Sequence, residues 1–93
     1  MKFECKKTEN CFARSQTYEY RLPVTGEVLS GLLPDDWEQR RNLRLRRPVF
    51  IADRSGVNVK GVLANDTVKV SYPDTCWEAE KRRFETWLEE TDV

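Results

Sequence analysis

The segment from residue 49 to residue 72 constrains the fold most, because short apolar and alternating runs are separated by turn-forming residues. The last run alternates strictly and places Val68, Val70 and Tyr72 on one face. A glycine at position 56 suits a turn that needs a positive φ, and Pro73 stops the last run. The pattern predicts a three-stranded meander. Its expected strands are residues 49–52, 57–63 and 67–72, and its expected turns are 53–56 and 64–66.

The N-terminal part predicts a β-hairpin. Residues 1–7 alternate, and in the second strand Tyr18, Tyr20 and Leu22 share one face. The tip of this hairpin is expected around residues 10–16, and Pro23 ends the second strand. We therefore expect an antiparallel pair that buries the two tyrosines.

Two helices are expected. Residues 24–33 are typical of a loop with apolar anchors, whereas residues 34–38 carry helix-start signals, with Asp35 and Asp36 as caps. That helix is expected to be short, since Leu43 and Leu45 alternate with arginines and Pro48 forbids continuation.

The C-terminal segment predicts an amphipathic helix. Thr75 and Glu78 fit a capping box, in which hydroxyl and carboxylate each accept from a free backbone amide. Trp77, Phe84 and Leu88 fall near one face, with Trp87 alongside.

The order β-β-α-β-β-β-α predicts an α+β fold. We expect a bent antiparallel sheet of about five strands, covered by the C-terminal amphipathic helix, and a small closed barrel is the alternative. Ninety-three residues suit a single domain spanning residues 1–93. No run approaches the roughly 18 apolar residues of a membrane helix, so a cytoplasmic location without membrane partners is expected.

The composition disfavours several kinds of enzyme. Histidine is absent, which removes the commonest general base and the commonest metal ligand. The cysteines are Cys5, Cys11 and Cys76, without a CxxC pair, so a zinc site is not expected. They are expected to be reduced, although a Cys5–Cys11 bridge is the alternative for an exported protein. Cys76 is the one candidate nucleophile, but a buried first-turn cysteine is the favoured interpretation. We predict a protein without catalytic residues, metal or cofactor.

Charge is distributed unevenly along a chain whose 16 basic and 16 acidic side chains balance. Residues 40–60 hold seven basic side chains against one acidic, and arginine favours bidentate binding of carboxylate or phosphate. We call these seven the basic strip: Arg40, Arg41, Arg44, Arg46, Arg47, Arg54 and Lys60. An opposed acidic surface is expected on the last helix, from Glu85, Glu89, Glu90 and Asp92.

Three interpretations of these charges remain open. The plainest is a solvated surface whose arginines pair with the acidic helix. A second is protein binding, in which either the basic strip meets an acidic groove or the acidic helix mimics phosphates. A third is single-stranded nucleic-acid binding by the strip, with stacking of bases on Phe50, Tyr18 and Tyr20.

In length, density of charge and lack of a catalytic motif, the chain resembles anti-CRISPR proteins, small inhibitors encoded by bacteriophages and other mobile elements. The resemblance is one of type and carries over no residue role. It implies stoichiometric binding to a CRISPR surveillance complex, which blocks engagement of nucleic acid. The prediction is therefore a non-enzymatic binding protein whose partner is a host protein or nucleoprotein complex. Direct nucleic-acid binding is the alternative.

Overall fold

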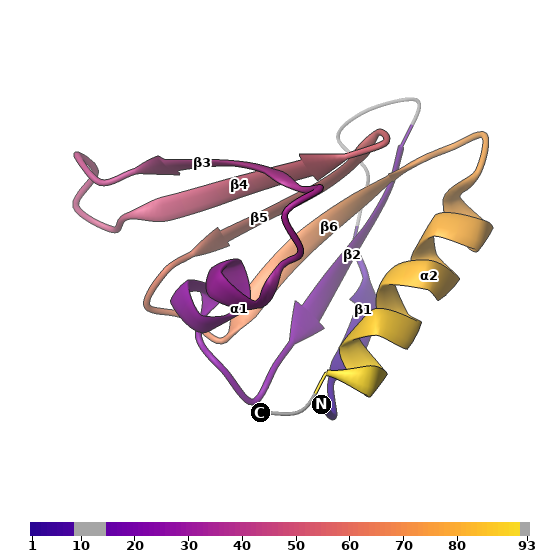
Figure 1. Ribbon diagram of the computed structural model, residues 1–93, viewed down its shortest axis with the longest axis horizontal. Helices are drawn as coiled ribbons and strands as arrows, with labels where there is room; N and C mark the ends of the chain where they lie inside the picture. Colours follow the sequence, from indigo (N-terminus) through magenta and orange to yellow (C-terminus); the bar gives the residue numbers. More distant parts are fainter. Residues whose placement is uncertain (9–14, 92–93) are drawn as a thin grey trace.

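In the computed structural model, which describes residues 1–8 and 15–91, six antiparallel strands form one open sheet (Figure 1). The strands lie in the order β1-β2-β6-β5-β4-β3. The elements are β1 (Glu4–Lys7), β2 (Ser15–Arg21), α1 (Gly26–Leu32), β3 (Glu38–Asn42), β4 (Val49–Arg54), β5 (Val57–Val62), β6 (Thr67–Pro73) and α2 (Trp77–Glu90). The α+β class is confirmed, with one strand more than predicted and without closure into a barrel.

The meander predicted from residues 49–72 is confirmed as β4, β5 and β6. Ser55 and Gly56 form the turn between β4 and β5, with φ values of 50° and 84°. Two successive positive φ values are the signature of the tight turn whose twist suits a hairpin. Arg54 and Val57 therefore lie directly opposite each other, which fixes the register of the pair.

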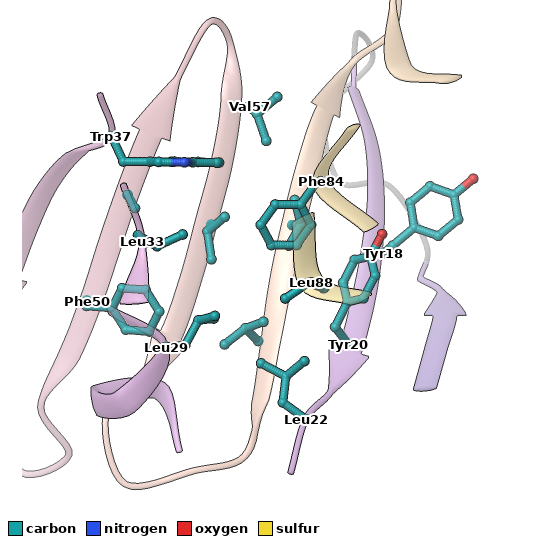
Figure 2. Packing of buried hydrophobic residues seen from close by; sticks show 14 of the residues in the cluster. Tyr18, Tyr20, Leu22, Leu29, Leu33, Trp37, Phe50, Val57, Phe84 and Leu88 are labelled. Carbon is teal, nitrogen blue, oxygen red and sulfur yellow. The ribbon is translucent and has the colours of Figure 1, made fainter. Parts of the chain in front are cut away.

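One face of the sheet holds the core, and both helices lie over it (Figure 1). Tyr18, Tyr20 and Leu22 are buried there, as their alternation predicts. Phe84 of α2 lies in the core near Leu88 and Tyr20 (Figure 2), and its ring centroid is 5.7 Å from that of Tyr20 and 6.0 Å from that of Trp37. Trp77 of α2 also stacks on Tyr18 of β2, so the helix is joined to the sheet through both edge-on and stacked aromatic rings.

The predicted position of the first helix is wrong, because α1 lies in the segment interpreted as a loop. Thr25 caps it, with its hydroxyl accepting from the Val28 amide at 3.5 Å. Leu29 and Leu33, four residues apart, are buried against the sheet. A helix of seven residues shows too little periodicity for the sequence to predict it, and packing stabilises it instead.

The segment predicted to start a helix leads into β3. Asp35 and Asp36 lie in a turn rather than at a helix start, and Trp37 is buried at 5% exposure. From Glu38 the chain pairs with β4, in a register that sets Arg41 opposite Phe50. Pairing with β4 satisfies the backbone groups of alternate residues of this segment and so overrides the local capping signal.

The amphipathic helix α2 is confirmed, with Phe84 and Leu88 buried and Trp77 and Trp87 partly buried. The predicted capping box at Thr75 is wrong, because Cys76 is the N-cap and makes no side-chain capping hydrogen bond. Cys76 is also exposed, not packed beneath the sheet as predicted.

The C-terminus of α2 is capped by the N-terminal ammonium group of the chain. Met1 donates to the carbonyl oxygen of Leu88 at 2.7 Å and to that of Thr91 at 2.6 Å. The last carbonyls of a helix lack partners within the helix and carry partial negative charge, so a cation stabilises them. This contact holds the residues before β1 against the end of α2.

Candidate binding surfaces

The structure divides six of the seven residues of the basic strip among three surfaces, of which β3 is the first. Arg40 projects from the uncovered face of the sheet, where its guanidinium lies 3.4 Å from Asp53 and its side chain is 73% exposed. Arg41 projects from the opposite face and donates to the hydroxyl of Ser30 at 3.1 Å. The two adjacent arginines thus present charge on both sides of one edge strand.

Ser30 ties this edge strand to α1. It is buried at 3% exposure and donates its hydroxyl proton to the side-chain oxygen of Gln39. The amide nitrogen of Gln39 donates back to the Ser30 carbonyl at 3.0 Å. With the contact from Arg41, three hydrogen bonds hold β3 in place. The sequence predicts none of them, because a serine in an apolar segment does not show its partner.

The second place is the tip of the β3–β4 hairpin, which extends from the body of the protein (Figure 1). Arg44, Arg46 and Arg47 are all exposed there. Leu43 and Leu45 lie between them in the sequence, at 64% and 49% exposure. The backbone amide of Arg44 donates to the side chain of Asn42 at 3.2 Å and so shapes the start of the tip. We call residues 43–47 the arginine–leucine tip.

Arg54 does not belong to a binding surface. Its guanidinium carbon lies 4.5 Å from the centroid of the Trp37 ring, and it pairs with Asp36 at 3.3 Å. Only 14% of its side chain is exposed. Arg54 therefore covers the tryptophan and fixes the turn before β3, which is a structural role.

Lys60 occupies the third place, on the uncovered face of the sheet. It lies opposite Lys69 on β6 and Ile51 on β4. One transverse row across this face consists of Lys6, Glu19, Lys69, Lys60, Ile51 and Arg40, in strand order from β1 to β3. Four cations against one carboxylate make the row basic. Lys69 is not part of the basic strip, and only the register of β6 with β5 places it on this surface.

The aromatic residues expected to stack on bases are in the core. Phe50 and Tyr20 have no exposed surface, and Tyr18 is 9% exposed. Among the described residues, the large exposed apolar side chains are Val28, Leu43 and Leu45. The stacking part of the nucleic-acid interpretation is therefore wrong for these three rings.

The acidic helix surface is smaller than predicted. Glu85 is half-buried, accepts from the Tyr20 hydroxyl at 3.0 Å and pairs with Lys81 at 2.6 Å. Glu89 and Glu90 are exposed and remain available to a partner. Asp92 lies outside the described residues, as does Cys11, on which the alternative disulfide with Cys5 depends.

A polar cluster that no sequence pattern predicts lies under α2. Tyr20 accepts from Tyr72 across 2.7 Å while it donates to Glu85. Burial is the main cause that raises the pKa of both hydroxyls well above the ordinary value. Burial also raises the pKa of the Cys5 thiol, although the Tyr20 hydroxyl and the Lys81 charge partly offset it. The raised pKa values favour the protonated, neutral forms of these groups.

The pKa of Lys81 is raised for a different reason. Partial burial lowers it, but the hydrogen bond and the charge of Glu85 together outweigh that effect. The ammonium group also lies 4.8 Å from the centroid of the Tyr18 ring. Lys81 therefore stays charged and covers the aromatic end of the cluster.

The described residues contain no group of three or more histidine, cysteine, aspartate or glutamate side chains placed to hold a metal ion. Within the same ranges, 1–8 and 15–91, none of the helices is both long and apolar enough to cross a membrane. Comparison of the chain with protein-family models, curated proteins and solved structures gave no match. The surfaces therefore have to be interpreted from their own chemistry.

Proposed function

We propose that this protein is a non-enzymatic binding protein and that the arginine–leucine tip is its main contact with a protein partner. The observation that carries the proposal is the exposure of Leu43 and Leu45 between three exposed arginines. Arginine is enriched at protein interfaces and apolar side chains fill their centres, whereas phosphate groups gain nothing from leucine. The tip thus fits an acidic protein groove with an apolar floor.

The electrostatic environment of the tip supports the same proposal. Arg44, Arg46 and Arg47 lie within four residues, and such close like charges repel one another in the free protein. An acidic partner would relieve that repulsion and accelerate association. Two other strip residues already have intramolecular acidic partners, since Arg40 pairs with Asp53 and Arg54 pairs with Asp36.

The narrower proposal is that the protein acts as a stoichiometric inhibitor of a host nucleoprotein machine such as a CRISPR surveillance complex. Its support is the resemblance of size, charge and absent catalytic motif to anti-CRISPR proteins. Blocking of nucleic-acid engagement then follows from occupation of a surface by the tip, with no chemical step. Glu89 and Glu90 on α2 would provide a second, acidic contact.

Direct binding of single-stranded nucleic acid is the second candidate, and the transverse basic row favours it. Lys60 and Lys69 face each other on the uncovered surface of the sheet, and Arg40 continues the row. Phosphates would neutralise this row, and affinity would then fall steeply with salt, by a slope of about −0.7 per phosphate contact. A flat salt response would exclude this candidate.

Affinity capture of the tagged protein from a bacterial lysate, divided into nuclease-treated and untreated halves, tests the proposal. We expect a protein complex of fixed stoichiometry that survives the nuclease. Capture that consists of nucleic acid, or that disappears after nuclease treatment, would contradict the proposal and favour the second candidate.

A further inference from the structure

The outer edge of β3 indicates how the partner binds. β3 pairs only with β4 in the described sheet and is its last strand, so one side of its backbone has no neighbouring strand. All five of its residues are exposed. An edge of this kind is a template for the addition of another strand.

The register of the sheet identifies the free backbone groups. The tight turn at Ser55 and Gly56 makes the flanking residues, Arg54 and Val57, a hydrogen-bonded pair with β5. Because such pairing alternates along antiparallel strands, Asp53 and Ile51 direct their backbone groups toward β3 instead. Their partners are Glu38 and Arg40.

The remaining residues of β3 therefore direct their backbone away from the sheet. Gln39 and Arg41 alternate with the bonded residues and leave their N–H and C=O groups facing outward. Their side chains are held by Ser30, which keeps this edge in an extended conformation. The strand is thus preorganised, which reduces the entropic cost of pairing.

The charge of the edge selects the partner. Arg40 and Arg41 present cations on opposite faces of the sheet. Adjacent residues of an added strand also point to opposite faces, so two adjacent carboxylates of that strand would each lie beside one arginine. The neighbouring tip adds three more arginines. A second copy of this chain fits poorly. Antiparallel pairing of two β3 strands, centred on Arg40, would place the Arg40 residues of the two copies directly opposite each other.

We propose that the partner binds by adding an acidic β-strand to β3, with two adjacent carboxylates beside Arg40 and Arg41. This inference rests on the proposed function, since it assigns the partner's chemistry at the same surface. It adds that backbone pairing at Gln39 and Arg41, and not only side-chain contact at the tip, contributes to binding.

Amide hydrogen exchange, resolved by residue with nuclear magnetic resonance, tests the proposal. The probe is a capped peptide, Val-Thr-Val-Glu-Glu-Val-Thr-Val, and the control peptide has Lys-Lys at its centre. At a peptide concentration ten times its dissociation constant, exchange at Gln39 and Arg41 is expected to slow by about tenfold. Exchange at Arg40 and Asn42, whose amides already face β4, is expected to stay unchanged. The lysine peptide is expected to bind at least about tenfold more weakly.

Charge reversal gives an independent readout with a matched control. Arg40→Glu is expected to weaken binding of the acidic peptide about tenfold. Arg21→Glu is the control, because Arg21 is also exposed on the uncovered face and pairs with Asp66 at 3.7 Å, but lies on β2. Equal loss in both variants would mean that overall charge governs binding and would overturn the inference.

Two further outcomes would overturn the inference. Absence of peptide binding, or slowing that does not alternate along β3, would exclude strand addition. Protection of Gln39 and Arg41 in the free protein, together with a dimer by sedimentation, would assign the edge to a second copy. The proposed function has its own test, which is the charge reversal of Arg44, Arg46 and Arg47. If that reversal still abolishes partner capture, the proposed function stands although strand addition is excluded. Failure of the inference can therefore be distinguished from failure of the proposed function.

Discussion

The hydroxyl oxygens of Tyr20 and Tyr72 lie 2.7 Å apart on side chains that are fully buried. The two residues come from neighbouring strands, β2 and β6, and α2 closes the cluster with Glu85. A buried hydroxyl needs a partner, so this pair makes the position of α2 dependent on the register of the sheet. Stability of the platform that carries both binding surfaces therefore depends on it.

Replacement of Tyr20 by phenylalanine is expected to lower the free energy of unfolding by about 1–3 kcal/mol. The change removes the donor to Glu85 and the acceptor of Tyr72 together, so the buried Tyr72 hydroxyl loses its partner while Glu85 keeps only Lys81. Tyr72→Phe is the matched control and is expected to cost only about 0.5–1.5 kcal/mol, since Tyr20 still bonds to Glu85. Urea unfolding of the two variants measures the difference, and equal losses would contradict the assigned network.

Alkaline pH is expected to destabilise the protein through the same pair. The pKa of each hydroxyl is raised in the folded state, so the folded protein holds these protons more tightly than the unfolded chain does. This contribution to stability is complete below about pH 9 and is lost as pH rises past about 10, by up to about 1.4 kcal/mol per pH unit for each tyrosine. Lys81 and Cys5, with raised pKa values, act in the same direction.

The pH profile is measured by urea unfolding between neutral and strongly alkaline pH. The double variant Tyr20→Phe with Tyr72→Phe is expected to show a shallower alkaline decline, although its stability at neutral pH is lower. An equally steep decline in the double variant would mean that other groups cause the alkaline loss.

Two glycines of α1 are expected to respond oppositely to alanine. A Cβ atom at Gly26 would lie 2.6 Å from the carbonyl oxygen of Val62 and 3.0 Å from the Phe50 ring. Gly26→Ala is therefore expected to cost about 1–3 kcal/mol of stability. Gly31 has open space around the same position, so Gly31→Ala is expected to add about 0.5–1 kcal/mol. Thermal unfolding compares them, and a stabilising Gly26→Ala would contradict the close approach of α1 to β5.

The elements that the sequence predicts correctly are those whose signal is local. Strict alternation identifies Val68, Val70 and Tyr72 as inward residues of β6, and all three are buried. Helical spacing does the same for Phe84 and Leu88 of α2. In both cases the buried side chains repeat over enough residues to define a period.

The elements that the sequence misses depend on partners far along the chain. Helix-start residues directly precede β3, and only its register with β4 makes it a strand. Ser30 gives no sign that it binds Gln39 and Arg41. Likewise, Lys69 joins the basic row because of its register with Lys60.

The candidate site is predicted in part for the same reason. The density of arginine in residues 40–47 identifies a charged surface, and five of the strip's residues are exposed on β3 and the tip. The sequence does not show that Arg54 covers the Trp37 ring and pairs with Asp36. It also does not show that Leu43 and Leu45 stay exposed rather than pack inward.

Partner capture by charge-reversed and matched variants tests the central claim most directly. A triple variant is expected to reduce the amount of captured partner at least about thirtyfold, as loss of an interface hot spot does. It combines Arg44→Glu, Arg46→Glu and Arg47→Glu in one chain. Arg82→Glu with Arg83→Glu, exposed on α2, serves as control and is expected to capture the partner as the unmodified protein does. If the tip variant folds and still captures its partner fully, the arginine–leucine tip is not the binding surface.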